Sequence, residues 1–349
     1  MNSLNWQDEF KSELAKLGKK IREFGMRVSM HPGQYTVLNS PNMEIVKRAV
    51  VDLEYHCSFL DALGVGSECK LVLHIGGVYD DRKAAVERFV ENFELLNEQI
   101  KSRLVIENDD KNYTVEEVLL ISKRLHIPVV FDNLHNLLNP SKKDLREDEW
   151  LKLCKDTWKE VDGVQKIHYS QASKNYKSGA HSGTIHAEEF LKFYNQIEDK
   201  NTDIMLEVKD KNISAIKCIY LVDGQLQILA LEKEWARYKY VILSRDVRVY
   251  NDIRELLKNK NNVDALGFYT LIEEALGIPE NKGAEINAAA HIWGYVSDKA
   301  SAIQKNRYNK LLSSYSEGGI QIATLKNHLL KCAVEQDIEY LINSYYFYL

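Results

Sequence analysis

One unit recurs six times along the first two thirds of the chain, and it constrains the fold more than any other feature. Each unit has a short β-branched run, a polar loop and a segment with apolar residues at helical spacing. The alternation predicts a parallel sheet covered by helices, either as a barrel or as a doubly wound sheet. The expected strands are 26–30, 70–75, 103–106, 128–131, 164–167 and 203–206, and the expected helices are 42–63, 82–101, 114–125, 147–159 and 187–196.

Side chains that can bind a metal stand at the end of every expected strand. In a TIM-type barrel the C-terminal strand ends meet at one mouth, so such residues would converge in space. A doubly wound sheet usually has a glycine-rich phosphate loop at its switch point, and neither GxGxxG nor GxxxxGK occurs in the chain. The pattern therefore favours the barrel. The candidate ligands are His31, His74, Glu107, Asp132, His135, His168 and Glu207.

The ligand chemistry narrows the choice of metal. Imidazole and carboxylate groups without cysteine suit manganese, zinc or iron and argue against calcium or an iron–sulfur cluster. The candidates are too many for one ion, so we expect a cluster of two or three, which is typical of phosphodiester hydrolysis. The cysteines lack CxxC spacing and predict buried, reduced thiols; they are Cys57, Cys69, Cys154, Cys218 and Cys332.

Composition bears on location and on partners. The sequence has no apolar run of about 18 residues, and residues 1–11 are polar, so we expect a cytoplasmic protein without membrane contact. The net charge of -5 argues against a protein that grips nucleic acid by bulk positive charge. Bound cations would cancel the ligand carboxylates, however, and local lysines can still face a phosphate backbone.

Long motifs closely resemble the UV damage endonuclease family (UvsE/UVDE) over about residues 1–220. They match in order and at sensible spacing, so the resemblance is specific. The motifs are RVSMHPGQYTVLNSP (27–41), LVLHIGGVYDDR (71–82), LVIENDDKNYT (104–114), VVFDNLHN (129–136), KIHYSQ (166–171), GAHS (179–182) and MLEVKDKNISAIK (205–217).

This resemblance implies a TIM-type barrel related to endonuclease IV. It implies a metal-dependent DNA repair enzyme that nicks damaged double-stranded DNA immediately 5′ of pyrimidine dimers, 6-4 photoproducts and some abasic sites. Manganese is the favoured ion, with zinc or magnesium as alternatives, and Asp132, Glu207 and Lys166 are the implied catalytic residues. The implied metal ligands are His31, His74, Glu107, Asp132, His135, His168, His181 and Glu207.

Two positions leave alternatives open. Lys166 precedes His168 by two residues, so both side chains should face the barrel interior. It could be a cation near the scissile phosphate, a carbamylated ligand or a solvent-facing lysine. The turn after His31 presents Gln34 and Tyr35, a pair associated with lesion sensing in the family; the ring could wedge into a base stack or simply pack.

Further DNA contacts are expected around the same mouth. Asn39, Lys209 and Lys211 are predicted to contact DNA together with Gln34 and Tyr35. Lys111, Lys174 and Lys177 lie in loops on the same expected face.

The chain departs from the family pattern in two ways. Asn136 stands where many members have a second histidine after His135. The family normally has roughly two further βα units before the segment that matches residues 5–20. We therefore expect an open barrel with exposed strand edges, poorly stable and weakly active alone, and monomeric unless the absent segment is supplied in trans.

The C-terminal part has a different character. Residues 231–349 have helical spacing throughout and many tyrosines, which predicts an all-α domain after a barrel of residues 1–225. It resembles the YbgA-like domain of unknown function. His291, Trp293 and Tyr295 could form a site or a packed helix face. Four basic residues could contact DNA or lie on a solvated face: Arg237, Lys239, Arg245 and Arg248.

Two other functions compete with a repair endonuclease. A sugar isomerase or epimerase of the same barrel superfamily would also place His, Glu and Asp around metals, but it should lack the HPGQY loop and the surplus of ligands. Alternatively, a shortened barrel is inactive and the chain has a binding role.

Overall fold

The computed structural model describes residues 4–173, 180–260 and 262–349, which form two compact units. The barrel unit comprises Met1–Ile185 with Lys192–Ser214, and the helical unit comprises His186–Leu191 with Ala215–Leu349. The helix α9 (Ala187–Gln196) therefore contributes residues to both. Each unit is described by itself.

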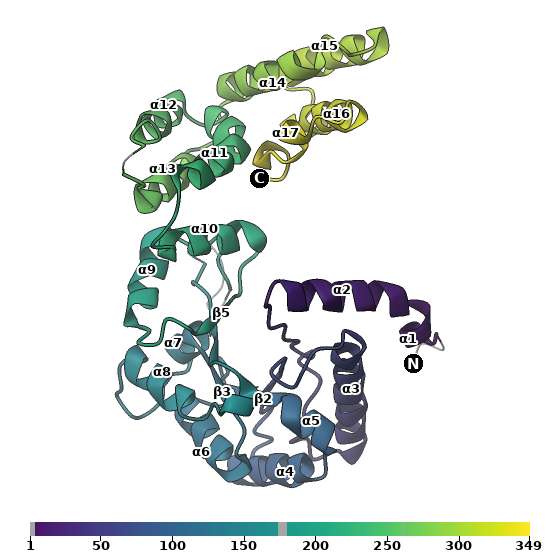
Figure 1. Cartoon of the computed structure of the whole chain (residues 1–349), viewed down its shortest axis with the longest axis vertical. Coiled ribbons are helices and arrows are strands. Elements are labelled where there is room, and N and C mark those ends of the chain that lie inside the picture. Colours follow the sequence, from purple (N-terminus) through teal and green to yellow (C-terminus); the bar gives the residue numbers. More distant parts are fainter. Residues whose placement is uncertain (1–3, 174–179, 261) are drawn as a thin grey trace. The chain divides into compact units, whose positions relative to one another are not determined.

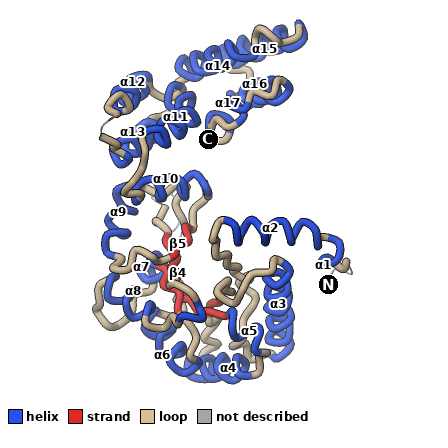
Figure 2. The backbone as a smooth tube through the Cα atoms, in the orientation of Figure 1, coloured by secondary structure: helices blue, strands red, loops and turns tan. Residues whose placement is uncertain are grey.

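The barrel unit is built on five parallel strands that pair in chain order (Figure 1 and Figure 2). The first two strands pair without an offset. Leu71 pairs with Leu104 and His74 with Glu107, so the strand ends that carry His74 and Glu107 lie side by side. The strands are β1 (Leu71–His74), β2 (Leu104–Glu107), β3 (Val129–Asp132), β4 (Lys166–Tyr169) and β5 (Asp203–Leu206).

The first strand expected from the sequence, 26–30, is not a strand in the structure. Within 26–30, Met30 alone forms a parallel bridge, and its partner is Leu71. Upstream of the bridge, the side chain of Arg27 pairs with Asp203: Nε donates to Oδ2 at 2.8 Å, and Nη2 lies 2.6 Å from the same oxygen. The backbone of Met30 is hydrogen-bonded to Lys70 and Val72, whereas Arg27 is held through its side chain.

Helices cover the strands, and most have a clear capping residue. The capping box of Thr114 and Glu117 opens α6, as its sequence predicts. The expected helix 82–101 is two helices, because Asn97 accepts from the amide of Ile100 and starts a new turn. The helices are α1 (Trp6–Glu9), α2 (Lys11–Glu23), α3 (Met43–Ala62), α4 (Arg82–Glu94), α5 (Glu98–Arg103), α6 (Val115–Leu125), α7 (Asn133–Leu138) and α8 (Glu147–Lys155).

The helical unit has no strand among its described residues, as expected for an all-α region. Tyrosines make up much of its core: Tyr238, Tyr269 and Tyr346 are buried, as are Phe268 and Ile292. Every described helix of the chain is too short or too polar to span a lipid bilayer. The helices are α10 (Asn212–Val222), α11 (Ile228–Leu243), α12 (Val247–Leu256), α13 (Ala265–Gly277), α14 (Lys282–Val296), α15 (Ala302–Ser316), α16 (Ile322–Glu335) and α17 (Glu339–Ile342).

The sequence-based architecture is confirmed: parallel strands alternate with helices, and an all-helical region follows. Within the described residues, β5 pairs with β4 and the Met30 bridge pairs with β1. These two positions flank the sheet; His31 and Glu207 follow them, and His74, Glu107, Asp132 and His168 lie on the strands between them.

Candidate metal centre

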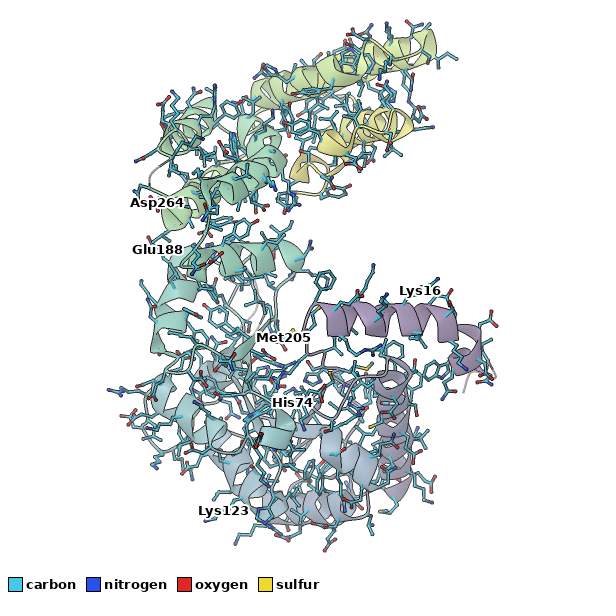
Figure 3. All side chains as sticks on the ribbon, viewed as in Figure 1. Lys16, His74, Lys123, Glu188, Met205 and Asp264 are labelled. Carbon is cyan, nitrogen blue, oxygen red and sulfur yellow. The ribbon has the colours of Figure 1, made fainter. Side chains whose placement is uncertain are left out.

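Each strand carries a polar residue at or near its C-terminal end, so these residues lie along the same edge of the sheet. His74 ends β1, Glu107 ends β2 and Asp132 ends β3. His168 lies opposite Asp132 in the β3–β4 register, and the amide of Glu207 donates to the carbonyl of Tyr169 just beyond β5. Figure 3 labels His74 on the barrel unit, and its side chain is 30% exposed.

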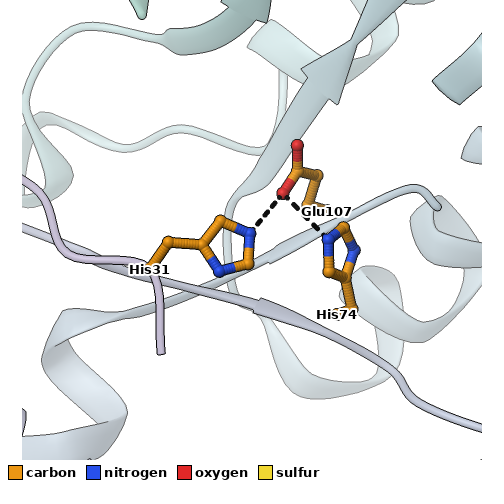
Figure 4. A group of neighbouring side chains, drawn as sticks. All are labelled: His31, His74 and Glu107. Carbon is orange, nitrogen blue, oxygen red and sulfur yellow. Dashed lines mark hydrogen bonds and ion pairs between the residues drawn. The ribbon is translucent and has the colours of Figure 1, made fainter. Parts of the chain in front are cut away.

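Glu107 is the centre of this group and is fully buried. Its Oε2 lies 3.0 Å from Nε2 of His31 and 3.6 Å from Nε2 of His74, as Figure 4 shows. Its Oε1 lies 2.8 Å from Nδ1 of His168. One carboxylate thus faces imidazoles on both sides, as a ligand shared between two ions would.

Two sets of donor atoms meet at Glu107. His31, His74 and Glu107 form the first set, and Glu107, Asp132, His168 and Glu207 form the second. Within each set the ligand atoms lie within 4.8 Å of one another. Such spacing suits two neighbouring divalent cations with a bridging carboxylate.

The hydrogen bonding of the cluster supports the fit of a cation. Glu107 Oε1, Asp132 Oδ2 and the Nδ1 atoms of His74 and His168 are buried without a hydrogen-bond partner. Glu107 Oε1 and His168 Nδ1 are close, yet they lack the angles of a hydrogen bond. Since buried polar groups are nearly always hydrogen-bonded, these orphaned atoms fit a site whose donors point at a metal.

Main-chain carbonyls orient two of the imidazoles. His31 Nδ1 lies 3.1 Å from the carbonyl oxygen of Pro32, and His135 Nδ1 lies 3.0 Å from that of Asn108. An N–H at each Nδ1 would leave the Nε2 atoms as ligands, the usual arrangement at metal centres.

Two asparagines that were not predicted as site residues link neighbouring strand ends through hydrogen bonds to the backbone. Asn108 donates to the carbonyl of Asp132 and accepts from its amide, and Asn133 makes the same reciprocal pair with Ser170. Each asparagine directly follows a carboxylate ligand, Glu107 or Asp132. That Glu-Asn and Asp-Asn repetition was the available signal.

Burial and mutual charge shift the pKa values of the cluster. Burial raises the pKa of Asp132 to about 7. Burial lowers the pKa of His168, but the carboxylates of Glu107 and Glu207 outweigh it and raise the value to about 10. The pKa of Glu107 lies well below its usual range, because the charge and contact of His168 outweigh burial.

The remaining predicted ligands flank this core. His135 Nδ1 lies 3.8 Å from Asp132 Oδ1, and His181 Nδ1 lies 3.5 Å from Glu207 Oε2. All the residues implied as ligands by the sequence thus lie at one end of the strands, and their coordination of metal remains a proposal.

Lys166 is inside the barrel unit, so the solvent-facing alternative is wrong. Its side chain is buried, and Nζ donates to Ser29 Oγ at 3.0 Å. Burial lowers the pKa of Lys166 to about 8, while the charge of Asp203 raises it and that of Arg27 lowers it further. The amine therefore lies toward the start of the strands, below His168.

A cavity of about 730 Å³ opens above the cluster and is lined by His31, Gln34, Tyr35, Tyr79 and Lys111, among others. The ring of Tyr35 is 82% exposed, so the alternative of a packed tyrosine is wrong.

Other residues expected to contact DNA have different surroundings. Asn39 is fully buried and donates to the carbonyl of Gly77 at 2.7 Å, which corrects the expectation that it faces DNA. Lys209 and Lys211 are exposed. Lys174 and Lys177 lie outside the described residues.

Comparisons with known proteins agree with this geometry. Residues 2–234 match the family described as UV-endonuclease UvdE, and residues 239–349 match a protein family of unknown function, DUF1722. A UV DNA damage endonuclease of Clostridium perfringens (strain 13 / Type A) is 42% identical over 284 residues, which are 80% of this chain and 68% of that protein.

A UV DNA damage endonuclease of Bacillus cereus (strain 03BB102) is 36% identical over 207 residues, covering 58% of this chain and 64% of the relative. The crystal structure of SacUVDE is similar with a TM-score of 0.58 at 41% identity, covering 62% of this chain and 72% of that chain. The chain thus spans about two thirds of the length of these relatives.

Proposed function

The chain belongs to the UV-endonuclease UvdE family through residues 2–234, and we propose that it is a metal-dependent DNA repair endonuclease. In this proposal it hydrolyses the phosphodiester immediately 5′ of UV photoproducts in double-stranded DNA. Pyrimidine dimers, 6-4 photoproducts and some abasic sites are the proposed substrates.

The observation that carries the proposal is the buried, shared carboxylate of Glu107 between two sets of donor atoms. His31 and His74 would complete one metal position, and Asp132, His168 and Glu207 the other, with His135 and His181 beside them. Divalent cations held there would activate water and stabilise the leaving oxygen of a phosphodiester. The mixed imidazole and carboxylate donors favour manganese, with zinc or magnesium as alternatives.

The chain's own residues would position the substrate. Tyr35 and Gln34 stand at the mouth of the cavity, where an exposed ring can insert into a weakened base stack beside a lesion. Lys209 and Lys211 would contact backbone phosphates. We propose that Lys166, a buried side chain on the same strand as His168, is a cation near the scissile phosphate or becomes a carbamylated ligand.

A nicking assay on supercoiled plasmid tests this function. The full chain is stripped with a chelator and then given manganese, zinc or magnesium with UV-irradiated or untreated plasmid. We expect metal-dependent conversion of irradiated plasmid to the open circle, with 5′ cuts at photoproducts when end-labelled DNA is mapped. If the protein binds metal but cuts neither plasmid, the endonuclease proposal fails and a binding role is favoured.

A further inference from the structure

The loop after β1 contains an unusual backbone turn at the mouth of the cavity above the cluster. Tyr79 and Asp80 are consecutive residues with φ of 50° and 62°, and the amide of Asp81 donates to the carbonyl of Val78 at 3.1 Å. Two left-handed residues closed by such a hydrogen bond make a type I′ turn, which glycine, asparagine and aspartate normally occupy. A tyrosine in this turn is strained, because its Cβ crowds the following carbonyl oxygen.

Besides this turn, three residues other than glycine are left-handed in the described part of the chain. His126 is the C-cap of α6 and Asp337 follows the C-cap of α16, and a left-handed residue is common where a helix ends. Lys211 is a single exposed residue directly before α10. Tyr79 differs from all three, because a second left-handed residue follows it and its side chain lines the cavity.

Hydrogen bonds from three side chains hold this loop in place. The buried amide of Asn39 donates to the carbonyl of Gly77 at 2.7 Å, and the hydroxyl of Tyr113 donates to the same oxygen at 3.3 Å. Asn112 Nδ2 donates to the carbonyl of Gly76 at 3.2 Å. Gly76 has φ of 109°, and a Cβ there would collide with Oδ1 of Asn39. The surrounding side chains therefore enforce the backbone course of the loop.

The ring of Tyr79 is held on this loop and is still partly open. A Cβ placed on Gly77 would lie between 3.1 and 3.5 Å from three carbons of the ring, so the ring lies directly on the Gly77 backbone. The guanidinium carbon of Arg88 lies 5.6 Å from the ring centroid, and Arg88 Nε donates to the carbonyl of Asn39 at 2.8 Å. Tyr79 is nevertheless 40% exposed.

A fixed aromatic ring beside the metal centre is suited to one kind of ligand. The cavity is lined by two exposed tyrosines, Tyr35 and Tyr79, together with His31 and His74. Nucleobases stack on such rings whatever their sequence, because every base has a π face. Strained residues persist where the surrounding structure enforces them, and they cluster at ligand-binding sites. Packing alone would not require a tyrosine in a turn that favours smaller residues.

We propose that Tyr79 is a fixed stacking surface for an unpaired nucleobase of the bound DNA. The inference rests on the proposed function, because it adds a DNA contact to the same site. It gives the two rings different roles: Tyr35 would insert into the base stack, and Tyr79 would hold a base that has left it. Asn39 is then a positioning residue, which acts through the carbonyl of Gly77.

The test measures binding of the full chain, in chelator, to two labelled duplexes, one fully paired and one with a short mismatch bubble. Neither duplex carries a photoproduct, so binding is measured apart from incision. Tyr79→Phe keeps the ring, Tyr79→Ala removes the ring but keeps the strain, and Tyr79→Gly removes both. The matched control is His126→Gly, which relieves a left-handed residue of the same unit outside the lining of the cavity.

We expect Tyr79→Ala and Tyr79→Gly to bind the bubble duplex about tenfold more weakly than the unaltered chain, because each loses one stacked base. Tyr79→Phe and His126→Gly should bind it normally, and binding of the paired duplex should change little in all four variants. In thermal unfolding, Tyr79→Gly should melt about 2–4 °C higher than Tyr79→Ala, because glycine adopts the left-handed turn without strain.

Equal losses of bubble binding in Tyr79→Ala and Tyr79→Gly, despite their different melting midpoints, would assign the effect to the ring. Normal bubble binding by Tyr79→Gly overturns the proposal, and so does a loss in Tyr79→Phe as large as that in Tyr79→Ala. An unaltered chain that does not prefer the bubble over the paired duplex also overturns it. Nicking of irradiated plasmid is measured separately with metal. If bubble binding depends on the ring but irradiated plasmid is not nicked, the proposed incision fails and the stacking contact stands.

Discussion

The buried carboxylates of the two units differ in their hydrogen-bond donors. In the helical unit, Glu234 accepts hydrogen bonds from Tyr345 at 3.0 Å and Arg237 at 3.1 Å, and Glu285 accepts one from Tyr315. In the barrel unit, Glu107 and Asp132 are as deeply buried, yet each keeps one oxygen without a hydrogen-bond donor.

The difference separates a structural carboxylate from a ligand. A buried carboxylate costs several kcal/mol unless donors or a cation compensate its charge. Tyrosine and arginine compensate Glu234 permanently, so its site is closed. Glu107 faces imidazoles instead, and in the proposed function a metal would displace their protons. The burial of a carboxylate therefore does not indicate whether it is structural or could bind a metal. The identity of the side chains around it does.

The largest expected effect comes from removing the shared charge with Glu107→Gln. The amide keeps the shape but cannot bridge two cations, so incision of irradiated plasmid should fall by about two orders of magnitude or more. Metal content, measured by elemental analysis after dialysis, should fall with it. The matched change in the helical unit, Glu285→Gln, should leave both unchanged. Normal nicking by Glu107→Gln would refute the assignment of the centre.

Changing pH should alter metal affinity at the barrel unit. Metal binding must displace the proton of His168, whose pKa is raised to about 10, and below pH 7 it must also displace that of Asp132, whose pKa is about 7. Apparent affinity should therefore rise with pH, by about tenfold per unit for each proton displaced. A competition titration with a chelator from pH 6 to 9 measures this. A flat profile would show that these groups do not bind the ion.

An exposed tyrosine of the barrel unit should contribute to the preference for damaged DNA, and an exposed tyrosine of the helical unit should not. Tyr35 is 82% exposed at the mouth above the metal centre, whereas Tyr295 is 49% exposed on the helical unit. Stacking of a base on a ring contributes about 1–3 kcal/mol, so Tyr35→Ala should reduce the preference for irradiated over untreated duplex by about tenfold. Tyr295→Ala serves as the control. Competition binding with both duplexes would contradict the wedge if the Tyr35→Ala preference stayed intact.

Much of the candidate metal centre could be predicted, because several of the candidate ligands directly follow or end an apolar run. An apolar run predicts a buried strand, and the polar residue that ends it must lie at the strand's C-terminal end. Glu107 after Leu104–Ile106 and Asp132 after Val129–Phe131 illustrate this local logic. The capping box at Thr114 was equally local.

The errors arose where distant residues decide the outcome. Residues 26–30 look like a strand, but Arg27 is held by Asp203, 176 residues away in sequence. Asn39 was expected to contact DNA, but its side chain is buried and its amide donates to the carbonyl of Gly77. The asparagine pairs at the strand ends also depend on register, which one sequence does not display.

The smallest expected effect comes from removing hydrogen-bond donors from the buried carboxylates of the helical unit, Glu234 and Glu285. Tyr345→Phe removes one donor from Glu234, but Arg237 remains 3.1 Å away, so the free energy of unfolding should fall by about 1 kcal/mol. Tyr315→Phe removes the hydroxyl that bonds Glu285, and an uncompensated buried charge should cost more, about 1–3 kcal/mol. Urea unfolding with a probe of the helical unit ranks the two variants. Metal content should stay normal in both, because neither carboxylate belongs to the centre. If Tyr345→Phe proved the more damaging, or if either variant lost metal, compensation by fixed donors would not distinguish the helical unit from the barrel unit.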